Sequence, residues 1–176
     1  MSHFAALSKL LGPESSLISD PDITTSYSRD QAPFAVSSPP FAVLLARTAA
    51  EISIALKYAN ENKIPVVTRG AGSGLSGGAN ASADSLVISL EKMNQIIEID
   101  AANQIARVQA GVINLDLDTA ASKLGLAYLP DPASRDWSSL LQLRNSCRLA
   151  TASGKQLWPA STLAEYRLAL LAPAHI

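Results

Sequence analysis

The sequence is poor in the residues that build disulfides and metal sites. Its 176 residues include one cysteine, Cys147, and two histidines, His3 and His175, which stand near opposite ends. A single cysteine cannot close an internal disulfide, and no cysteine–histidine cluster has the spacing of a zinc site. These shortages exclude a disulfide-stapled domain and a zinc module, and they favour a reducing, cytoplasmic location.

Charge and long apolar runs are also scarce. Charged residues make up 16% of the chain, and 14 Lys and Arg nearly balance 15 Asp and Glu. Nucleic acid is therefore not an expected partner, because phosphate binding needs clustered cations. No apolar run approaches the roughly 18 residues of a spanning helix, and residues 1–12 lack the basic start of an export signal. A hydrophobic content of 48% is nevertheless sufficient for a buried core, which excludes a fully disordered chain.

The predicted elements indicate an α+β fold. The segment Thr48-Ala-Ala-Glu51 is a capping box that starts a helix between two apolar strands, and such a strand–helix–strand unit implies a parallel crossover. Asn114 is expected to cap a later helix that Gly125 ends. Residues 20–40 are rich in Pro, Ser, Thr and Asp and predict an irregular connection. Strands are predicted over 41–46, 65–68, 86–90, 96–99, 105–110 and 126–129, and helices over 3–11, 48–62 and 114–124.

A glycine-rich segment follows the second predicted strand. Five of the nine glycines in the chain fall within residues 70–78, directly after Arg69. Glycine takes positive φ freely and has no Cβ to block an approaching group, so successive backbone amides can turn toward one anion. The segment therefore predicts a loop that cradles a diphosphate.

Three other interpretations of this loop compete with the diphosphate cradle. A Walker A loop needs Gly-Lys-Ser/Thr, but no lysine occurs between Lys63 and Lys92. Residues 72–77 match the dinucleotide pattern G-x-G-x-x-G, yet the chain continues into another strand instead of the helix that this motif requires. A flexible Gly/Ser linker remains an alternative. The apolar strand before the loop, Arg69 and Leu75 all favour the cradle over the linker.

Three segments in one order carry a family resemblance. They are Pro65-Val-Val-Thr-Arg-Gly-Ala-Gly-Ser-Gly-Leu-Ser-Gly-Gly-Ala79, Arg107-Val-Gln-Ala-Gly-Val112 and Tyr128-Leu-Pro-Asp-Pro-Ala-Ser134. Together they resemble the PCMH-type FAD-binding domain of the vanillyl-alcohol-oxidase flavoproteins, in the branch of the FAD-binding subunit of glycolate oxidase and of D-lactate dehydrogenase. The resemblance covers about residues 44–136. It implies a small parallel βαβ lobe and an incomplete second lobe with a mixed sheet.

The resemblance also implies which residues hold the cofactor. In the family, the glycine loop wraps the FAD pyrophosphate and the Pro-Asp-Pro segment lies near the flavin ring. Some members attach FAD covalently through a histidine, and Ser73 stands at that position here, so the resemblance implies non-covalent FAD. A rigid turn is the alternative interpretation of the Pro-Asp-Pro segment. The candidate cofactor-binding residues are Arg69, Gly70, Ala71, Gly72, Ser73, Gly74, Leu75, Ser76, Pro130, Asp131, Pro132 and Ser134.

The resemblance ends at about residue 139. Where the family continues with Ile-Gly-Gly-Asn, this chain has Leu140-Leu-Gln-Leu-Arg-Asn-Ser-Cys-Arg-Leu149. A shifted reading frame explains the change, and the coding DNA would decide that hypothesis. The expected division is an N-terminal helix and lead-in over 1–40, a truncated FAD-binding domain over 41–139 and an atypical tail over 140–176. Within the tail, Thr162-Leu-Ala-Glu165 predicts a short helix to Leu171.

The function implied by the resemblance is oxidation of a 2-hydroxy acid, of glycolate or D-lactate type, with hydride transfer to flavin N5. No catalytic or metal-binding residue is assigned, since the family's substrate domain lies beyond this sequence. The 2-hydroxy acid is therefore a partner only when the rest of the enzyme is supplied. Two alternatives stay open: a non-catalytic FAD- or nucleotide-binding module that needs a partner chain, and an inactive truncated product. Association with another subunit, and with a membrane through that subunit, is a further expectation.

Overall fold

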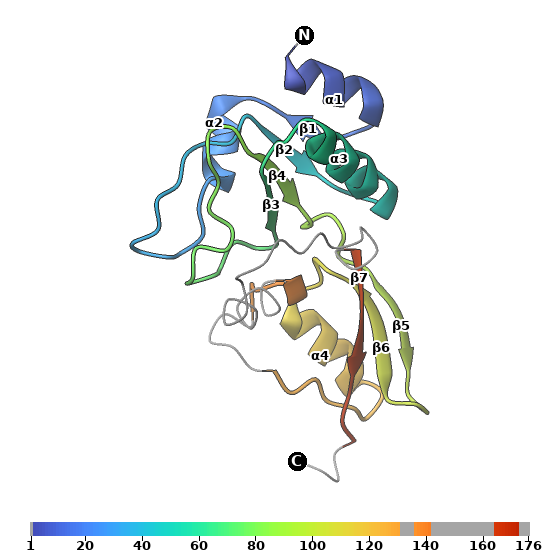
Figure 1. Ribbon diagram of the computed structural model, residues 1–176. Coiled ribbons are helices and arrows are strands. Elements are labelled where there is room, and N and C mark those ends of the chain that lie inside the picture. Colours follow the sequence, from blue (N-terminus) through green and yellow to red (C-terminus); the bar gives the residue numbers. More distant parts are fainter. Residues whose placement is uncertain (1, 131–135, 142–163, 173–176) are drawn as a thin grey trace.

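Two lobes lie one above the other in the computed structural model, which describes residues 2–130, 136–141 and 164–172 (Figure 1). The upper lobe in this view carries the first sheet and three helices, and the lower lobe carries the second sheet and one helix. The predicted α+β class is confirmed.

The first lobe is built on a four-stranded sheet in the order β1-β2-β4-β3. β1 (Leu17–Ile18) runs antiparallel to β2 (Ala42–Leu45), whereas β4 (Leu86–Ser89) runs parallel to both β2 and β3 (Val66–Arg69). The sheet is therefore mixed. The predicted parallel relationship of β2 and β3 is confirmed, although β4 inserts between them. Every residue of β4 is buried, which explains the continuous apolar character of this central strand.

Two helices cover one face of this sheet (Figure 1). α1 (His3–Leu11) begins after Ser2, whose side chain accepts the Ala5 amide, and ends at Gly12 with a φ of 85°. α3 (Ala49–Glu61) begins with the predicted capping box: the Thr48 hydroxyl accepts the Glu51 amide, and the Glu51 carboxylate accepts the Thr48 amide. Leu7 of α1 and Ile52 of α3 bury fully against the apolar side chains of β2 and β4.

The opposite face of the sheet is covered by loops. Val43 and Val87 are fully buried on this side, and they pack with Ala81 and Tyr27. Tyr27 ends a short helical stretch made of α2 (Pro21–Thr24) and the 3-10 helix η1 (Thr25–Tyr27). Residues 28–41 then form no helix or strand, but the predicted irregular connection began at residue 20, so the helical residues 21–27 contradict its first part.

The second lobe pairs an antiparallel sheet with one helix. The strands β5 (Ile96–Asp100), β6 (Ile105–Gln109) and β7 (Glu165–Ala169) follow one another across the sheet. α4 (Asn114–Ser122) buries Leu117 and Ala121 against the inward-facing Ala106 and Val108 of β6. In the described residues this sheet is antiparallel throughout, not mixed as the resemblance implied.

Three other local predictions were wrong. Asn114 is not the cap of α4: Ile113 holds that position, and the buried Asn114 side chain donates instead to Ser138. Residues 126–129 form no strand, because only Ala127 makes an isolated bridge, to Leu171. The segment after Ala164 is the strand β7 and not a helix. Tyr166 and Leu168 alternate with the exposed Glu165 and Arg167, so the burial follows the two-residue period of a strand.

Candidate functional site

The glycine-rich loop begins where β3 ends and leads to β4, the neighbouring strand. Because β3, β4 and β2 are parallel, the loop leaves the carboxyl edge of the parallel strands, which is the edge where open α/β sheets bind ligands. In Figure 1 the green loop runs beside the blue segment that precedes β2. The sheet thus fixes one end of the loop at a position suited to a ligand.

Backbone amides of the loop are largely free to bind an anion. Ala71 N donates to Ser139 Oγ at 3.3 Å, and Ala79 N donates to Asp30 Oδ2 at 3.4 Å. Between these two amides, the described part of the chain offers no acceptor to the amides of residues 72–78. Gly72, Ser73 and Gly74 are themselves buried. Buried amides in proteins are almost always paired, so the amides of these three residues are candidate donors to a diphosphate.

Ser73 adds a hydroxyl to these donors. The residue is 8% exposed, and among the described residues its Oγ has no hydrogen-bond partner. A buried hydroxyl without a partner is costly, and native proteins usually satisfy such a group with protein, water or ligand. The residues present therefore fit the diphosphate of a dinucleotide, with backbone amides and one hydroxyl as donors.

The Arg69 side chain contacts other parts of the protein. Its Nη1 donates to the carbonyl oxygen of Arg29 at 2.7 Å, and its guanidinium lies 5.6 Å from the centre of the Tyr27 ring. Burial lowers the pKa of Arg69 from its ordinary value, while Tyr27, Asp30 and Glu91 act in the opposite direction. The group remains a cation, as arginine does in proteins. The structure thus shows Arg69 joining the loop to the segment before β2.

Gly72 lies against this arginine. Its φ is 73°, a value that favours glycine, and a Cβ at this position would collide with the Arg69 guanidinium. The backbone angle favours glycine at position 72, and any larger residue would also displace the Arg69 guanidinium.

The segment after the Pro-Asp-Pro motif returns to the start of the loop. Ser138 O accepts the Asn114 amide, and the amides of Leu140 and Leu141 donate to Val112 and Ala110. This pairing places Ser139 against Gly70, where a Cβ would meet the Ser139 hydroxyl. A larger residue at position 70 would have to displace this hydroxyl. Residues 138–141 thereby connect the second lobe to the glycine loop.

The structure describes only some of the remaining predicted site residues. Gly70 through Ser76 lie together in the loop, with Ala71, Leu75 and Ser76 exposed. Pro130 is exposed at the end of the second-lobe segment. Asp131, Pro132 and Ser134 lie outside the described residues, so the predicted flavin-ring contacts stay a prediction.

Sequence reasoning missed two residues of this neighbourhood. Ser139 stood at the boundary of the resemblance, and Asp30 stood in the irregular lead-in. Asp30 is only 4% exposed, although it lies between exposed neighbours in a segment without helix or strand. The Asp30 carboxylate accepts the Ala32 amide in an Asx turn, but no local pattern links it to a loop about 50 residues later.

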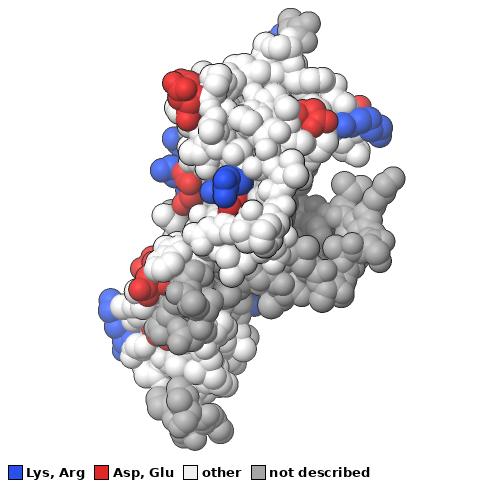
Figure 2. All heavy atoms as spheres, turned by 90° about the vertical axis from the view of Figure 1, so that its left-hand side faces the viewer, with Lys and Arg blue, Asp and Glu red and all other residues white. Residues whose placement is uncertain are grey.

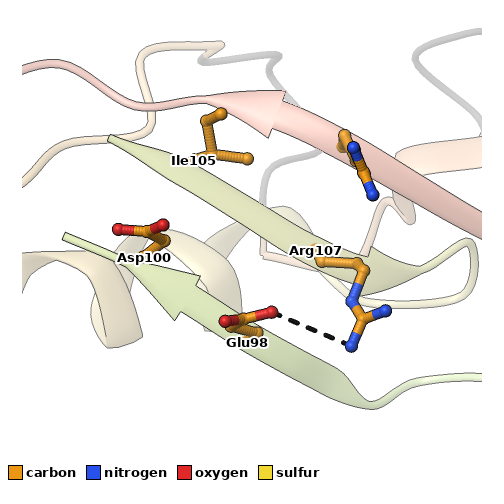
Figure 3. Close-up of a pocket in the computed structure, with 5 residues that line it drawn as sticks. Glu98, Asp100, Ile105 and Arg107 are labelled. Carbon is orange, nitrogen blue, oxygen red and sulfur yellow. Dashed lines mark ion pairs between the residues drawn. The ribbon is translucent and has the colours of Figure 1, made fainter. Parts of the chain in front are cut away.

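A second hollow lies on the outer face of the sheet β5-β6-β7 (Figure 3). It is lined by Glu98, Asp100, Ile105, Arg107 and Arg167, and Arg107 Nη2 lies 3.8 Å from Glu98 Oε2. Both partners of this ion pair are substantially exposed, so the pair contributes little to stability. The hollow holds no nucleophile or metal cluster, and it lies on the other lobe from the glycine loop.

The rest of the described chain offers no competing site. Residues 2–130, 136–141 and 164–172 contain no group of three or more potential metal ligands. Within the same ranges, no helix combines the length and the apolar character that crossing a bilayer requires. Figure 2 shows acidic and basic side chains interspersed on the face that it draws.

Comparison with known proteins agrees with this geometry. Residues 40–156 match the family model described as FAD binding domain. The glycolate oxidase subunit GlcD of Bacillus subtilis is 43% identical over 114 residues, which are 65% of this chain and 24% of that protein. A D-lactate dehydrogenase of Anaerostipes hadrus is 36% identical over 127 residues, which are 72% of this chain and 26% of that protein.

A solved structure extends the likeness to the fold. The 4-ethylphenol oxidase of Gulosibacter chungangensis superposes with a TM-score of 0.72 at 18% identity, covering 96% of this chain and 42% of that one. The chain spans about a quarter of the length of the two curated relatives described above. On the family match, which covers more than half of its residues, the chain belongs to the FAD binding domain family, of PCMH type, and is related to the glycolate oxidase subunit GlcD and to D-lactate dehydrogenase.

Proposed function

We propose that this chain is the FAD-binding portion of a flavin-dependent oxidoreductase that oxidises a 2-hydroxy acid of the glycolate or D-lactate type. The observation that carries the proposal is the run of loop amides from 72 to 78 that have no acceptor in the described chain, together with the buried Ser73 hydroxyl. The names of the relatives supply the substrate class.

The proposed roles follow from the geometry. The amides of Gly72, Ser73 and Gly74 and the Ser73 hydroxyl donate to the diphosphate oxygens. FAD would accept the hydride from Cα of the substrate, as the cofactor supplies the redox chemistry in such enzymes. Since Ser73 stands where covalent relatives of this fold carry a histidine, FAD is held without a covalent bond. No residue of this chain is assigned to the substrate's carboxylate or hydroxyl, because the resemblance implies that the family's substrate domain recognises them.

A second candidate function is that of an FAD-binding module that acts only with a partner chain. Under either proposal the chain works in the cytoplasm and meets a membrane only through a partner. An inactive truncated product, from a shifted reading frame after about residue 139, is the third alternative.

The visible spectrum of the purified full chain tests these proposals. Flavin bands that D-lactate or glycolate bleaches support the oxidoreductase, and flavin bands that neither acid bleaches support the module. A colourless chain that also fails to take up added FAD would overturn both the oxidoreductase and the module. The inactive product would then be the remaining alternative. Retention of flavin after denaturation in acid would contradict non-covalent attachment.

A pair of glycine variants tests the loop itself. Gly72→Val adds a side chain at positive φ and against Arg69, so we expect it to abolish FAD retention. Gly125→Val is the matched control, because Gly125 has a φ of 69° and nothing within 4 Å of an added Cβ. It imposes similar backbone strain on the second lobe and should leave FAD bound. Equal retention by both variants would refute the cradle.

A further inference from the structure

The glycine loop is held along its length by the segment just before β2. Gln31 N donates to Gly74 O at 2.8 Å, and Ala81 N donates to Ser28 O at 2.7 Å. Asp30 N donates to Asn80 Oδ1 at 2.9 Å. These bonds join two segments that are about 50 residues apart in the sequence, and the matched family residues begin only at position 40.

Asp30 is the centre of these contacts. It is 4% exposed, its Oδ1 accepts the Ala32 amide at 2.9 Å, and its Oδ2 accepts the Ala79 amide at 3.4 Å. A carboxylate buried to this extent needs several donors to offset its lost hydration. The Ala32 and Ala79 amides are two such donors, and the positive charge of Arg69 also favours the carboxylate, without an ion pair between the two side chains.

Arg69 completes the connection on the other side of the loop. Its bond to Arg29 O and its position over the Tyr27 ring draw the end of β3 toward the same segment. Tyr27 in turn donates to Glu91 Oε1 at 3.1 Å, just after β4. The guanidinium packs against Gly72, so its place sets how residues 72–74 are presented. We use the name loop brace for Tyr27, Asp30, Arg69 and Asn80.

We propose that the loop brace positions the free amides of residues 72–78 for the diphosphate, and that Asp30 and Arg69 act as positioning residues, not as direct ligands of the phosphates. This inference rests on the proposed function of the glycine loop. Asp30 carries a negative charge and is buried, so it cannot itself attract a phosphate. Arg69 spends one of its guanidinium donors on the Arg29 carbonyl. Part of the irregular lead-in thus belongs to the cofactor site.

Asp30→Asn tests the brace in the full chain. The amide group keeps an oxygen for Ala32 N but presents N–H groups to Ala79 N, so one loop contact and the charge are lost. We expect the dissociation constant for FAD, measured by quenching of flavin fluorescence, to rise about tenfold or more, which corresponds to the loss of one charge-assisted bond. Asp22→Asn makes the same charge change at an exposed position and should bind FAD like the wild type.

Hydrogen exchange separates positioning from general destabilisation. In Asp30→Asn without FAD, the hydrogen-bonded amides of Gln31, Asn80 and Ala81 should exchange faster, while those of α3 and β4 keep their wild-type rates. A uniform increase across the first lobe would overturn the positioning role. If Asp30→Asn does not fold, Asn80→Ala provides the same test, because it removes the acceptor for Asp30 N at a less buried position.

The salt dependence of binding tells whether Arg69 touches the phosphates. Arg69→Gln should weaken FAD binding without changing the slope of log Kd against log salt concentration, whereas loss of a direct phosphate contact would reduce that slope. Arg47→Gln, an exposed arginine at the start of α3, is the matched control. A reduced slope in Arg69→Gln overturns its assignment as a positioning residue.

The outcomes distinguish this inference from the proposed function. One result supports the diphosphate cradle and refutes the loop brace: the wild type binds FAD, Gly72→Val does not, and both Asp30→Asn and Asn80→Ala bind FAD as tightly as the wild type. If the wild type binds no FAD, the proposed function fails, and the brace fails with it.

Discussion

Ala71 N donates to Ser139 Oγ across the junction of the two lobes, at 3.3 Å. The two residues are 68 positions apart, and the hydroxyl fills the space beside Gly70 that a Cβ would otherwise occupy. One serine from the second lobe therefore contacts both Gly70 and the first amide of the glycine loop.

Gly70→Ala should destabilise the chain through this contact. Its φ is not in the positive range, so alanine imposes no backbone strain, but the added Cβ collides with Ser139 Oγ. Overpacking of this kind costs about 1–3 kcal/mol in the free energy of unfolding, measured by urea denaturation. The double variant with Ser139→Ala removes the colliding oxygen and should recover most of the loss. If the two single effects simply add, the collision is not the cause.

Ser73→Ala should affect stability and binding in opposite directions. Its Oγ is buried without a partner among the described residues, so removing it should leave the free energy of unfolding of the FAD-free chain unchanged or slightly raised. If the hydroxyl donates to the diphosphate, the FAD dissociation constant should rise about tenfold, or about 1.4 kcal/mol. Titration with FAD and urea denaturation check the two quantities separately. Wild-type affinity in this variant would show that the backbone amides suffice.

Alkaline pH should weaken the fold through Tyr27. Burial and the neighbouring Glu91 raise its pKa above the ordinary value of 10.0. Between that value and the higher folded pKa, the unfolded chain releases its proton while the folded chain keeps it, so stability is full below pH 10 and falls as pH rises through this window. Urea midpoints should decline above about pH 10, and Tyr27→Phe should decline less steeply.

A second tyrosine provides the comparison for this pH effect. Burial also raises the pKa of Tyr128, in the second lobe, so Tyr128→Phe should likewise make the decline less steep. The double variant should show the smallest pH dependence of the three. Parallel declines in the wild type and both single variants would contradict the assignment.

Leu170→Ala should show whether the end of the chain stabilises the second lobe. Leu170 is 2% exposed and packs in the same cluster as Leu117 and Val108. Loss of such a side chain costs about 2–5 kcal/mol of unfolding free energy. Leu124→Ala, at a leucine that is 51% exposed, is the control and should change stability by no more than about 0.5 kcal/mol. Equal urea midpoints for the two variants would show that residues after 164 do not stabilise this lobe.

The elements with strong local signals were predictable from the sequence. α1 ends at Gly12 and α3 begins at the Thr48–Glu51 capping box, because each signal acts within one helical turn. Strand positions followed from apolar runs for the same reason. Where local and distant interactions competed, prediction failed: Asn114 resembles a cap but bonds to Ser138, and β7 pairs with β6 although its sequence begins like a helix.

The sequence by itself determined the glycine loop, its place after a parallel strand and the family to which the chain belongs, because glycine content and motif spacing are local properties. Only the tertiary structure decided which side chains contact the loop. It brought Asp30 and Ser139 to opposite ends of the same short segment and turned Arg69 toward Arg29 and Tyr27. Such contacts depend on burial and on bonds between distant residues, which no spacing along the chain encodes.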